Sequence, residues 1–343
     1  MSIPHVRSFS APAFVATAPQ GAPPMPAGGL LAIDAGQSSI KVRHSTGGGV
    51  TDWSISGIRT DIPLMPQLAA VLSEAQRRGH AASEVGIGVS GLTGAATDAD
   101  ELMRVAGSWG ARSLSIAHDS ITAFLGALGD TRGAVVAVGT GVVTLAVGRT
   151  EIARVDGWGH LLGDAGSGFW IGRAALDAVL RANDGRGPAT ALTAAVRAEF
   201  PVLEDAYIEL QADQDRVRRV AAYARAVAEA AAAGDEVAIA VSVAAAEQLA
   251  HSVASGLLRA GEIGPEGREP VDAEASSAGV PVRAIGGVLG SAVLADAFRV
   301  AVLRRIPAAD VRVGRADPLD GAARLPAVAE GSPLRPLVIR VTA

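Results

Sequence analysis

The sequence predicts an α/β protein made of two related halves that face one another across a cleft. The chain has 343 residues, enough for two domains with buried cores. Hydrophobic residues make up 49% of it but aromatic residues only 3%, which favours sheets covered by Ala-rich helices over an aromatic sugar-stacking or RNA-binding surface. The third observation is that an order of three strands followed by helices and further strands occurs twice.

The first half begins after Gly28 and Gly29 with a short apolar run that ends at Asp34. Alternating apolar segments and turn signals set the other boundaries. We predict strands over 30–33, 40–44 and 50–55, a helix over 63–78, a strand over 85–90, a helix over 98–109, a strand over 114–117 and a helix after Asp119.

The second half begins after Gly133 and repeats the three strands, followed by a Gly-rich loop and Ala-rich helices. We predict strands over 134–138, 142–147 and 151–155, helices from 169 onward and near 189–200, 214–233 and 236–260, a strand over 282–285, a helix over 291–304, a strand over 310–313, a short helix over 319–329 and a terminal apolar run over 337–341.

The proposed domain division follows from these elements. Residues 1–28 are rich in Pro and small residues and are expected to form a disordered leader. We assign 29–118 to an N-terminal lobe and 119–318 to a C-terminal lobe, with about 319–343 as a segment that could pack back on the N-terminal lobe. The stretch 261–280, rich in Gly, Glu, Pro and Ser, is expected to be a loop or a partly disordered insertion.

Composition also limits the function. Without cysteine the chain has no disulfide, thiol catalysis or protein-held iron–sulfur cluster. Its net charge of −5, without a basic stripe or a helix-turn-helix, argues against a nucleic-acid partner. No long apolar run of a membrane helix and no signal-peptide core is found, so we expect no membrane partner and a cytoplasmic location.

Three glycine turns follow predicted strands. Residues 34–39 read DAGQSS: Gly36 permits a tight turn whose N–H groups can face phosphate, Ser38 and Ser39 add hydroxyls, and Asp34 can hold a Mg²⁺-bound water. An ordinary β-hairpin is the alternative. The triplet Gly139, Thr140 and Gly141 lies at the equivalent place in the second half, and the pair suggests a nucleotide held between the lobes.

The third turn, with Gly286 and Gly287, joins a strand to a helix, and its glycines permit the backbone to approach a base or ribose closely. The alternative is a plain connecting turn. No GK[ST] Walker sequence and no GxGxxG follows these strands. Asp119 stands at a strand end and a helix start. It either caps that helix or orients and deprotonates an attacking hydroxyl.

The loop 156–172 contains six glycines, too many for a structural turn. Asp164 and Ser167 supply groups that could bind sugar hydroxyls, although Asp164 could instead cap the next helix. Trp158 and Trp170 are expected to pack rather than to stack on a sugar, and His160 is interpreted as a satisfied loop histidine.

At this loop the sequence resembles a known family. GWGHLLGDAGSGFWIG is similar to the signature of N-acetylglucosamine kinases within the BadF/BadG/BcrA/BcrD ATPase family. DAGQSS, GTG, HDSITAFLGAL and AIGGVLGSAVLADAF resemble that family's phosphate, catalytic and adenosine motifs, in the same order over about 30–330. The resemblance implies the actin-like ATPase fold, also called the sugar kinase/Hsp70/actin fold, with two ribonuclease-H-like lobes around a central cleft.

The resemblance also implies roles for residues. It implies ATP and Mg²⁺ as cofactors and the MgATP-dependent phosphorylation of an amino sugar, N-acetylglucosamine at its 6-hydroxyl. The expected partners are the sugar and the nucleotide, and a homodimer is one assembly that we consider. Asp119 would be the catalytic base. The other assignments are Asp34 as the Mg²⁺-water ligand; Asp34, Gly36, Gln37, Ser38, Ser39, Gly139, Thr140, Gly141, Gly286 and Gly287 on the nucleotide; and Gly91, Asp119, Gly157, Asp164, Ser167 and Gly168 on the sugar.

Three departures keep alternatives open. Gln37, Ser38 and Ser39 replace the usual Gly-Thr-Lys, so that Lys41 comes two residues later. The loop 57–62 lacks the asparagine with which the family's characterised kinases bind their sugar, and Ala165 stands where many relatives have glutamate. The substrate could therefore be glucosamine or another hexose, or the chain could bind or sense a sugar without catalysis. An ATPase that activates a partner enzyme through an iron–sulfur cluster is disfavoured by the missing cysteines.

Overall fold

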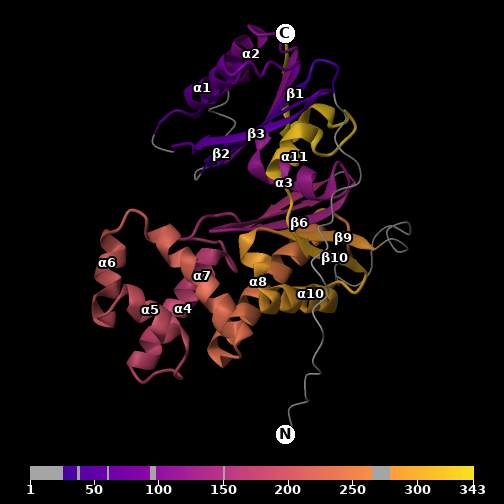
Figure 1. The fold of residues 1–343 in the computed structure, drawn as a ribbon. Helices are drawn as coiled ribbons and strands as arrows, with labels where there is room; N and C mark the ends of the chain where they lie inside the picture. The colour runs from indigo at the N-terminus through magenta and orange to yellow at the C-terminus, as the bar shows by residue number, and fades with distance from the viewer. Residues whose placement is uncertain (1–25, 37–38, 60–61, 93–97, 150, 265–278) are drawn as a thin grey trace.

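The computed structural model describes residues 26–36, 39–59, 62–92, 98–149, 151–264 and 279–343. Most of the predicted leader, most of the 261–280 insertion, and Gln37 with Ser38 therefore lie outside the described residues. Two β-sheets organise the rest, one in the upper part of Figure 1 and one near its middle.

The first sheet has the strand order β11-β5-β4-β1-β2-β3. Strands β1, β4 and β5 are parallel, whereas β2, β3 and β11 are antiparallel to their neighbours. Their bounds are β1 Leu30–Ala35, β2 Ser39–Thr46, β3 Gly49–Ser56, β4 Glu84–Val89, β5 Ser113–His118 and β11 Ile339–Thr342. Because β11 pairs with β5, the end of the chain returns to the sheet that the first half builds.

Helices cover both faces of this sheet. Leu31 and Ile33 of β1 belong to the core shared with α1 (Leu64–Arg77) and α2 (Ala99–Gly107), while Leu30 and Ala32 pack under α11 (Pro318–Arg324). A strand covered on both faces is apolar at successive positions, which explains the unbroken run at the start of the first half.

The second sheet has the order β10-β9-β6-β7-β8, with β6, β9 and β10 parallel. Its strands are β6 Gly133–Val138, β7 Val142–Val147, β8 Ile152–Val155, β9 Val280–Ile285 and β10 Ala309–Gly314. Most of the described helices belong to this half: α4 Gly168–Asn183, α5 Leu192–Glu199, α6 Ala206–Ala212, α7 Arg216–Ala232, α8 Glu236–Arg259 and α10 Ala292–Arg305. The predicted element order is confirmed in both halves, and α6 is an additional helix that was not predicted.

Helices α3 (Asp119–Leu128) and α11 lie against each other between the two sheets (Figure 1). They approach closely at Gly321, where an added Cβ would lie 1.8 Å from the carbonyl oxygen of Thr122. Helix α3 begins at Asp119 and also packs against β6 and β7. The contact between α3 and α11 therefore helps to fix the position of Asp119 between the two sheets.

Helix α8 is the one described helix that is long and apolar enough, by length and composition alone, to cross a membrane. It packs against β6, β7, β8 and α10, and its Leu249 and Val253 are completely buried. These contacts identify it as a helix of the protein core.

Candidate active site

A cleft of about 700 Å³ lies between the sheets, where strand ends of both halves meet. Its wall comes from the ends of β1, β4, β5 and β9, from the β6–β7 turn and from the loop after β8. The predicted site residues that line it are Asp34, Asp119, Gly139, Thr140, Gly141, Gly157, Asp164 and Gly286. Segments more than 250 residues apart in sequence thus meet at one site.

Asp119 is the carboxylate with the most partners in the cleft. Ser90 donates its hydroxyl to Oδ2, and Nδ1 of His118 lies 2.8 Å from Oδ1. The position follows from the sheet: Val89 of β4 stands opposite His118 of β5 in parallel register, so the next residues, Ser90 and Asp119, emerge side by side at the same edge.

Burial raises the pKa of Asp119, but hydrogen bonds from His118, Ser90 and the backbone N–H of Ser120 outweigh it and hold the pKa below its ordinary value. The group is therefore a carboxylate at neutral pH. A half-buried carboxylate facing a cleft is able to orient a hydroxyl and to accept its proton.

Asp34 lies at the end of β1, two strands from Asp119 at the same edge of the first sheet. Burial, together with the charges of Asp119 and Asp317, raises its pKa to about 6 against the opposing effect of Lys41. Within the described part of the chain its carboxylate has no hydrogen-bond donor and no ion-pair partner. Such a crowded negative site favours a cation.

These residues fit the Mg²⁺ ion that the family resemblance implies. Within the described ranges, no group of three or more His, Cys, Asp or Glu side chains could hold a metal ion by itself. Mg²⁺ is commonly bound through one or two carboxylates together with waters and substrate phosphates. Asp34, partly buried and without a partner among the described residues, can supply that carboxylate.

The β6–β7 turn is anchored on α4. The carbonyl oxygens of Gly139 and Thr140 accept the N–H groups of Gly168 and Phe169 at 2.8 and 3.0 Å. Asp164 lies directly against this turn, since a Cβ added at Gly141 would be 2.7 Å from Oδ2 of Asp164. The turn that resembles a phosphate motif and the loop that resembles a sugar motif are therefore one packed unit.

Asp156 organises the loop 156–165 and was not among the predicted site residues. Its carboxylate accepts the backbone N–H groups of Gly157 and Asp164 at 2.8 Å and of Ala165 at 3.0 Å. Asp156 and Asp164 both have left-handed backbone conformations, with φ of 61° and 58°. Asp tolerates this region better than most residues, which was the sequence signal available for Asp156.

Several predicted residues do not line the cleft. Ser167 is completely buried, and its hydroxyl caps α4 by accepting the N–H of Trp170, so Asp164 is not the cap of that helix. Gly168 packs behind the β6–β7 turn. The remaining predicted residues outside the wall are Gly36, Ser39, Gly91 and Gly287; Gln37 and Ser38 lie outside the described residues.

Other lining residues were missed as site residues: Ser90, His118, Arg154 and His160. His160 packs edge-on against Phe169 with ring centroids 4.9 Å apart. The expectation that Trp158 packs is wrong, because its side chain is 74% exposed at the tip of the loop that Asp156 holds.

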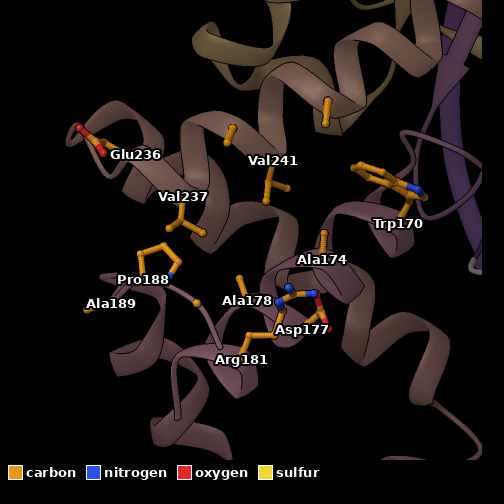
Figure 2. Close-up of a pocket in the computed structure, with 13 residues that line it drawn as sticks. Trp170, Ala174, Asp177, Ala178, Arg181, Pro188, Ala189, Glu236, Val237 and Val241 are labelled. Atoms are coloured by element: carbon orange, nitrogen blue, oxygen red, sulfur yellow. The ribbon is translucent and has the colours of Figure 1, made fainter. Parts of the chain in front are cut away.

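A second cavity, of about 810 Å³, lies between α4 and α8 (Figure 2). Ala174, Ala178, Val237 and Val241 form much of its wall, with Asp177 and Arg181 at one side. It has neither the glycine turn between β6 and β7 nor the carboxylates of the cleft, so the cleft is the candidate active site.

The two sheets with a cleft at their strand ends define the class: an actin-like ATPase fold, as found in sugar kinases. Solved structures support this, since the chain resembles a candidate N-acetylglucosamine kinase of Chromobacterium violaceum with a TM-score of 0.59 at 24% identity, covering 87% of this chain and 98% of that one. A candidate N-acetylglucosamine kinase of Porphyromonas gingivalis gives a TM-score of 0.62 at 19% identity, covering 86% and 98%.

The chain belongs to the BadF/BadG/BcrA/BcrD ATPase family, whose sequence profile matches residues 34–323. It is 30% identical to the N-acetyl-D-glucosamine kinase of Dictyostelium discoideum over 216 residues, 62% of this chain and 64% of that protein. It is 31% identical to the N-acetylmuramic acid/N-acetylglucosamine kinase of Clostridium acetobutylicum over 124 residues, 35% of this chain and 37% of that protein. The matches thus span less than two thirds of these relatives.

Proposed function

We propose that the chain is an ATP-dependent kinase that phosphorylates an amino sugar, N-acetylglucosamine at its 6-hydroxyl, with Asp119 as the general base. The observation that carries the proposal is the carboxylate of Asp119 in a cleft that also holds the β6–β7 glycine turn and Asp34. Both named relatives act on N-acetylglucosamine, which supports an amino sugar as substrate.

The proposed reaction needs positioning and charge neutralisation more than covalent chemistry by the protein. Asp119 accepts the proton of the sugar hydroxyl, whose oxygen forms a bond to the γ-phosphorus as the bond to the β–γ bridging oxygen breaks and ADP leaves. Ser90 and His118 hold the two carboxylate oxygens of Asp119 in place. When bound, Mg²⁺ neutralises charge on the phosphates, and Asp34 would hold it through water.

The sugar would lie between Asp119 and the loop after β8. Gly157 and Asp164 of that loop line the cleft beside the β6–β7 turn, whereas Gly286 lies at the end of β9, on the other side of that turn in the sheet order. We therefore assign the nucleotide base to the Gly286 side and the sugar to the Gly157 side. The domain division at 118/119 and a homodimeric assembly stay predictions.

The test is sugar-dependent ADP release by Asp119→Asn. The isosteric amide cannot accept the proton, and a general base is worth about 10²–10⁴-fold, so turnover is expected to fall at least that far while the affinity for ATP is retained. Ser90→Ala is the matched variant: it removes one hydrogen bond to Asp119 and is expected to lower kcat only modestly.

Near-full turnover by Asp119→Asn would show that another group is the base. A screen of N-acetylglucosamine, glucosamine, N-acetylmannosamine and glucose identifies the substrate by its kcat/KM. If none of these sugars raises ADP release although one binds by calorimetry, the chain is a sugar-binding protein without kinase activity. A preference for glucosamine would agree with the missing asparagine in 57–62.

A further inference from the structure

The imidazole of His118 lies between the carboxylate of Asp119 and the start of α3. Its Nδ1 is 2.8 Å from Oδ1 of Asp119, 3.2 Å from the N atom of Ser120 and 2.9 Å from the hydroxyl of Ser120. The nitrogen of a neutral ring carries either a lone pair or a proton, so it either accepts a hydrogen bond or donates one. What Nδ1 does among these neighbours therefore depends on its proton.

Without a proton, Nδ1 accepts the N–H of Ser120, a backbone group that can only donate. The ring proton is then on Nε2, and Nδ1 faces Oδ1 of Asp119 as one acceptor facing another at 2.8 Å. Two acceptors at this distance repel each other. A proton placed between them converts the repulsion into a charge-assisted hydrogen bond, so the pair favours the uptake of one proton.

The backbone around the pair tolerates that proton. When Nδ1 donates to Asp119 it no longer accepts from Ser120, but the carboxylate of Asp119 also accepts a hydrogen bond from the N–H of Ser120. The N–H of Ser120 therefore has an acceptor whether or not Nδ1 carries the proton. The proton can move from Asp119 to the ring without leaving a donor unpaired.

His118 can also pass the proton on. Imidazoles hold a proton about 400-fold more tightly than carboxylates, from ordinary pKa values of about 6.5 and 3.9, so the proton favours the ring over the carboxylate. The side chain of His118 lines the cleft and is 25% exposed. Within the described ranges its Nε2 has no hydrogen-bond partner, so the ring can release a proton to solvent.

We infer that His118 is the second proton acceptor of the reaction, which takes from Asp119 the proton that Asp119 has taken from the sugar hydroxyl. This inference rests on the proposed sugar kinase function and deepens it. The O–H bond of the sugar breaks as its oxygen bonds to the γ-phosphorus, and the proton goes first to Asp119 and then to Nδ1 of His118. Asp119 is a carboxylate again, and the imidazolium returns to its neutral form by losing one proton to solvent. Because His118 acts through Asp119, it positions the proton and does not contact the reacting atoms.

The first experiment compares sugar-dependent ADP release by the wild type, His118→Asn and His118→Ala. Asparagine is favoured at the N-cap and can accept the N–H of Ser120, but it cannot take up a proton. We expect kcat to fall roughly 10- to 100-fold in both variants, near the lower end of what an acid–base group contributes. KM for the sugar and for ATP should change less than about 2-fold, and only His118→Ala should have a lower Tm. A His118→Asn protein with the kcat of the wild type would show that His118 is only a helix cap, and would overturn the inference.

The second measurement is the dependence of kcat on pH. Imidazoles titrate between about pH 5 and 8, and a protonated ring cannot accept a proton, so the kcat of the wild type should fall toward acid in this range. The profile of His118→Asn should lack this fall. The other charged or titratable side chains that line the cleft in the described part of the chain are Asp34, Arg154, His160 and Asp164.

These other groups are separated from His118 by matched variants. A fall in kcat that persists in His118→Asn belongs to one of the groups that this variant retains, and would overturn the inference. So would a fall that disappears in His160→Gln. His251→Asn is the control, because His251 is an exposed residue of α8 that does not line the cleft, and it should keep both the kcat and the pH profile of the wild type.

The two proposals fail separately. If the wild type phosphorylates a sugar and His118→Asn does so equally well, only the second acceptor is refuted. If no sugar is phosphorylated, the kinase proposal fails, and nitrogen NMR of His118 at pH 7.5 still tests the proton pair. A neutral ring with an unprotonated Nδ1 supports the pair, and a neutral ring with the proton on Nδ1 overturns it, because that nitrogen could not accept the proton of Asp119.

Discussion

Replacing Gly321 by alanine tests whether the contact between α3 and α11 positions Asp119. A Cβ at Gly321 would lie 1.8 Å from the carbonyl oxygen of Thr122 and 3.0 Å from the N atom of Gly126. Ordinary contact begins near 3.4 Å, so the two helices would have to separate by the difference, about 1.6 Å. The atoms met are backbone, which cannot rotate away.

Overpacking of this kind costs about 1–3 kcal/mol and sometimes more, and we expect the upper end here because both contacts are to backbone atoms. For a chain of 343 residues, about 3 kcal/mol corresponds to a fall in Tm of roughly 4 °C. Asp119 is the first residue of α3, and a misplacement of about 1 Å can lower a rate 10²-fold. We therefore expect kcat to fall roughly 10- to 100-fold in the molecules that stay folded.

Thermal unfolding by circular dichroism and steady-state ADP release measure the two effects. Gly126→Ala is a milder variant of the same contact, with its nearest atom, the carbonyl oxygen of Asp317, at 3.0 Å, and Gly331→Ala is the control, with no atom within 4 Å. The losses should rank Gly321, Gly126, Gly331 from largest to smallest. A Gly321→Ala protein with the Tm and kcat of Gly331→Ala would refute the reasoning.

Three further outcomes are expected. Asp156→Ala removes the acceptor of three backbone N–H groups and should raise KM for the sugar about 10-fold or more. Asp156→Asn is the control, because it keeps one acceptor oxygen and tolerates the left-handed backbone. Equal KM values for the two variants would contradict the dependence of the loop on the Asp156 carboxylate. The pKa of Asp34 is raised to about 6 in the fold, so ionised Asp34 destabilises the folded state as pH rises from about 4 through 6; Asp34→Asn should raise the unfolding free energy at pH 7.5 by up to about 2–3 kcal/mol while lowering turnover, and a destabilised variant would disprove this. The pKa of His80 is lowered by burial and by His44, so the unfolding free energy should fall as pH drops below the unfolded pKa of about 6.5. Urea titrations at pH 7.5 and 5.0 should show a smaller loss of unfolding free energy in His80→Gln than in the wild type.

The tautomers of this histidine pair follow from its hydrogen bonds. Nε2 of His44 lies 2.9 Å from the carbonyl oxygen of Ala81, which only accepts, so Nε2 carries the proton. Nδ1 of neutral His44 then accepts from Nδ1–H of His80 at 3.2 Å. One hydrogen bond between the two rings thus joins β2 to the segment after α1.

Local patterns in the sequence predicted most elements because those elements depend on their own residues. The run 142–147 was predicted with its observed bounds, and β9 and β10 differ by only one or two residues at their ends. Helix α6 was missed because it has 7 residues and buries only Ala206, so it lacks the periodic apolar face by which helices are recognised.

The site was predicted less completely because it depends on which strands pair. Ser90 is 29 residues from Asp119, and the two meet only because β4 and β5 are parallel with Val89 opposite His118. A sequence shows that two strands exist but not their register, so the hydroxyl that holds Asp119 could not be assigned in advance. The contact of Asp164 with the β6–β7 turn depends in the same way on tertiary structure.

The two roles that the sequence left open for Asp119, helix cap or base, are separated by its neighbour. His118 occupies the N-cap position of α3, with Nδ1 3.2 Å from the N atom of Ser120 and 2.8 Å from Oδ1 of Asp119. This nitrogen accepts the N–H of Ser120 in the tautomer that leaves it unprotonated and donates to Asp119 when it carries the proton. Asp119 is the first residue within the helix, and its carboxylate turns to Ser90 across the strand ends. Because a histidine takes the capping position, the carboxylate faces the cleft, where burial would favour its neutral form and the surrounding donors keep it ionised. A proton acceptor at this place needs both conditions, and His118, which the sequence did not mark as a site residue, occupies the capping position so that Asp119 does not have to.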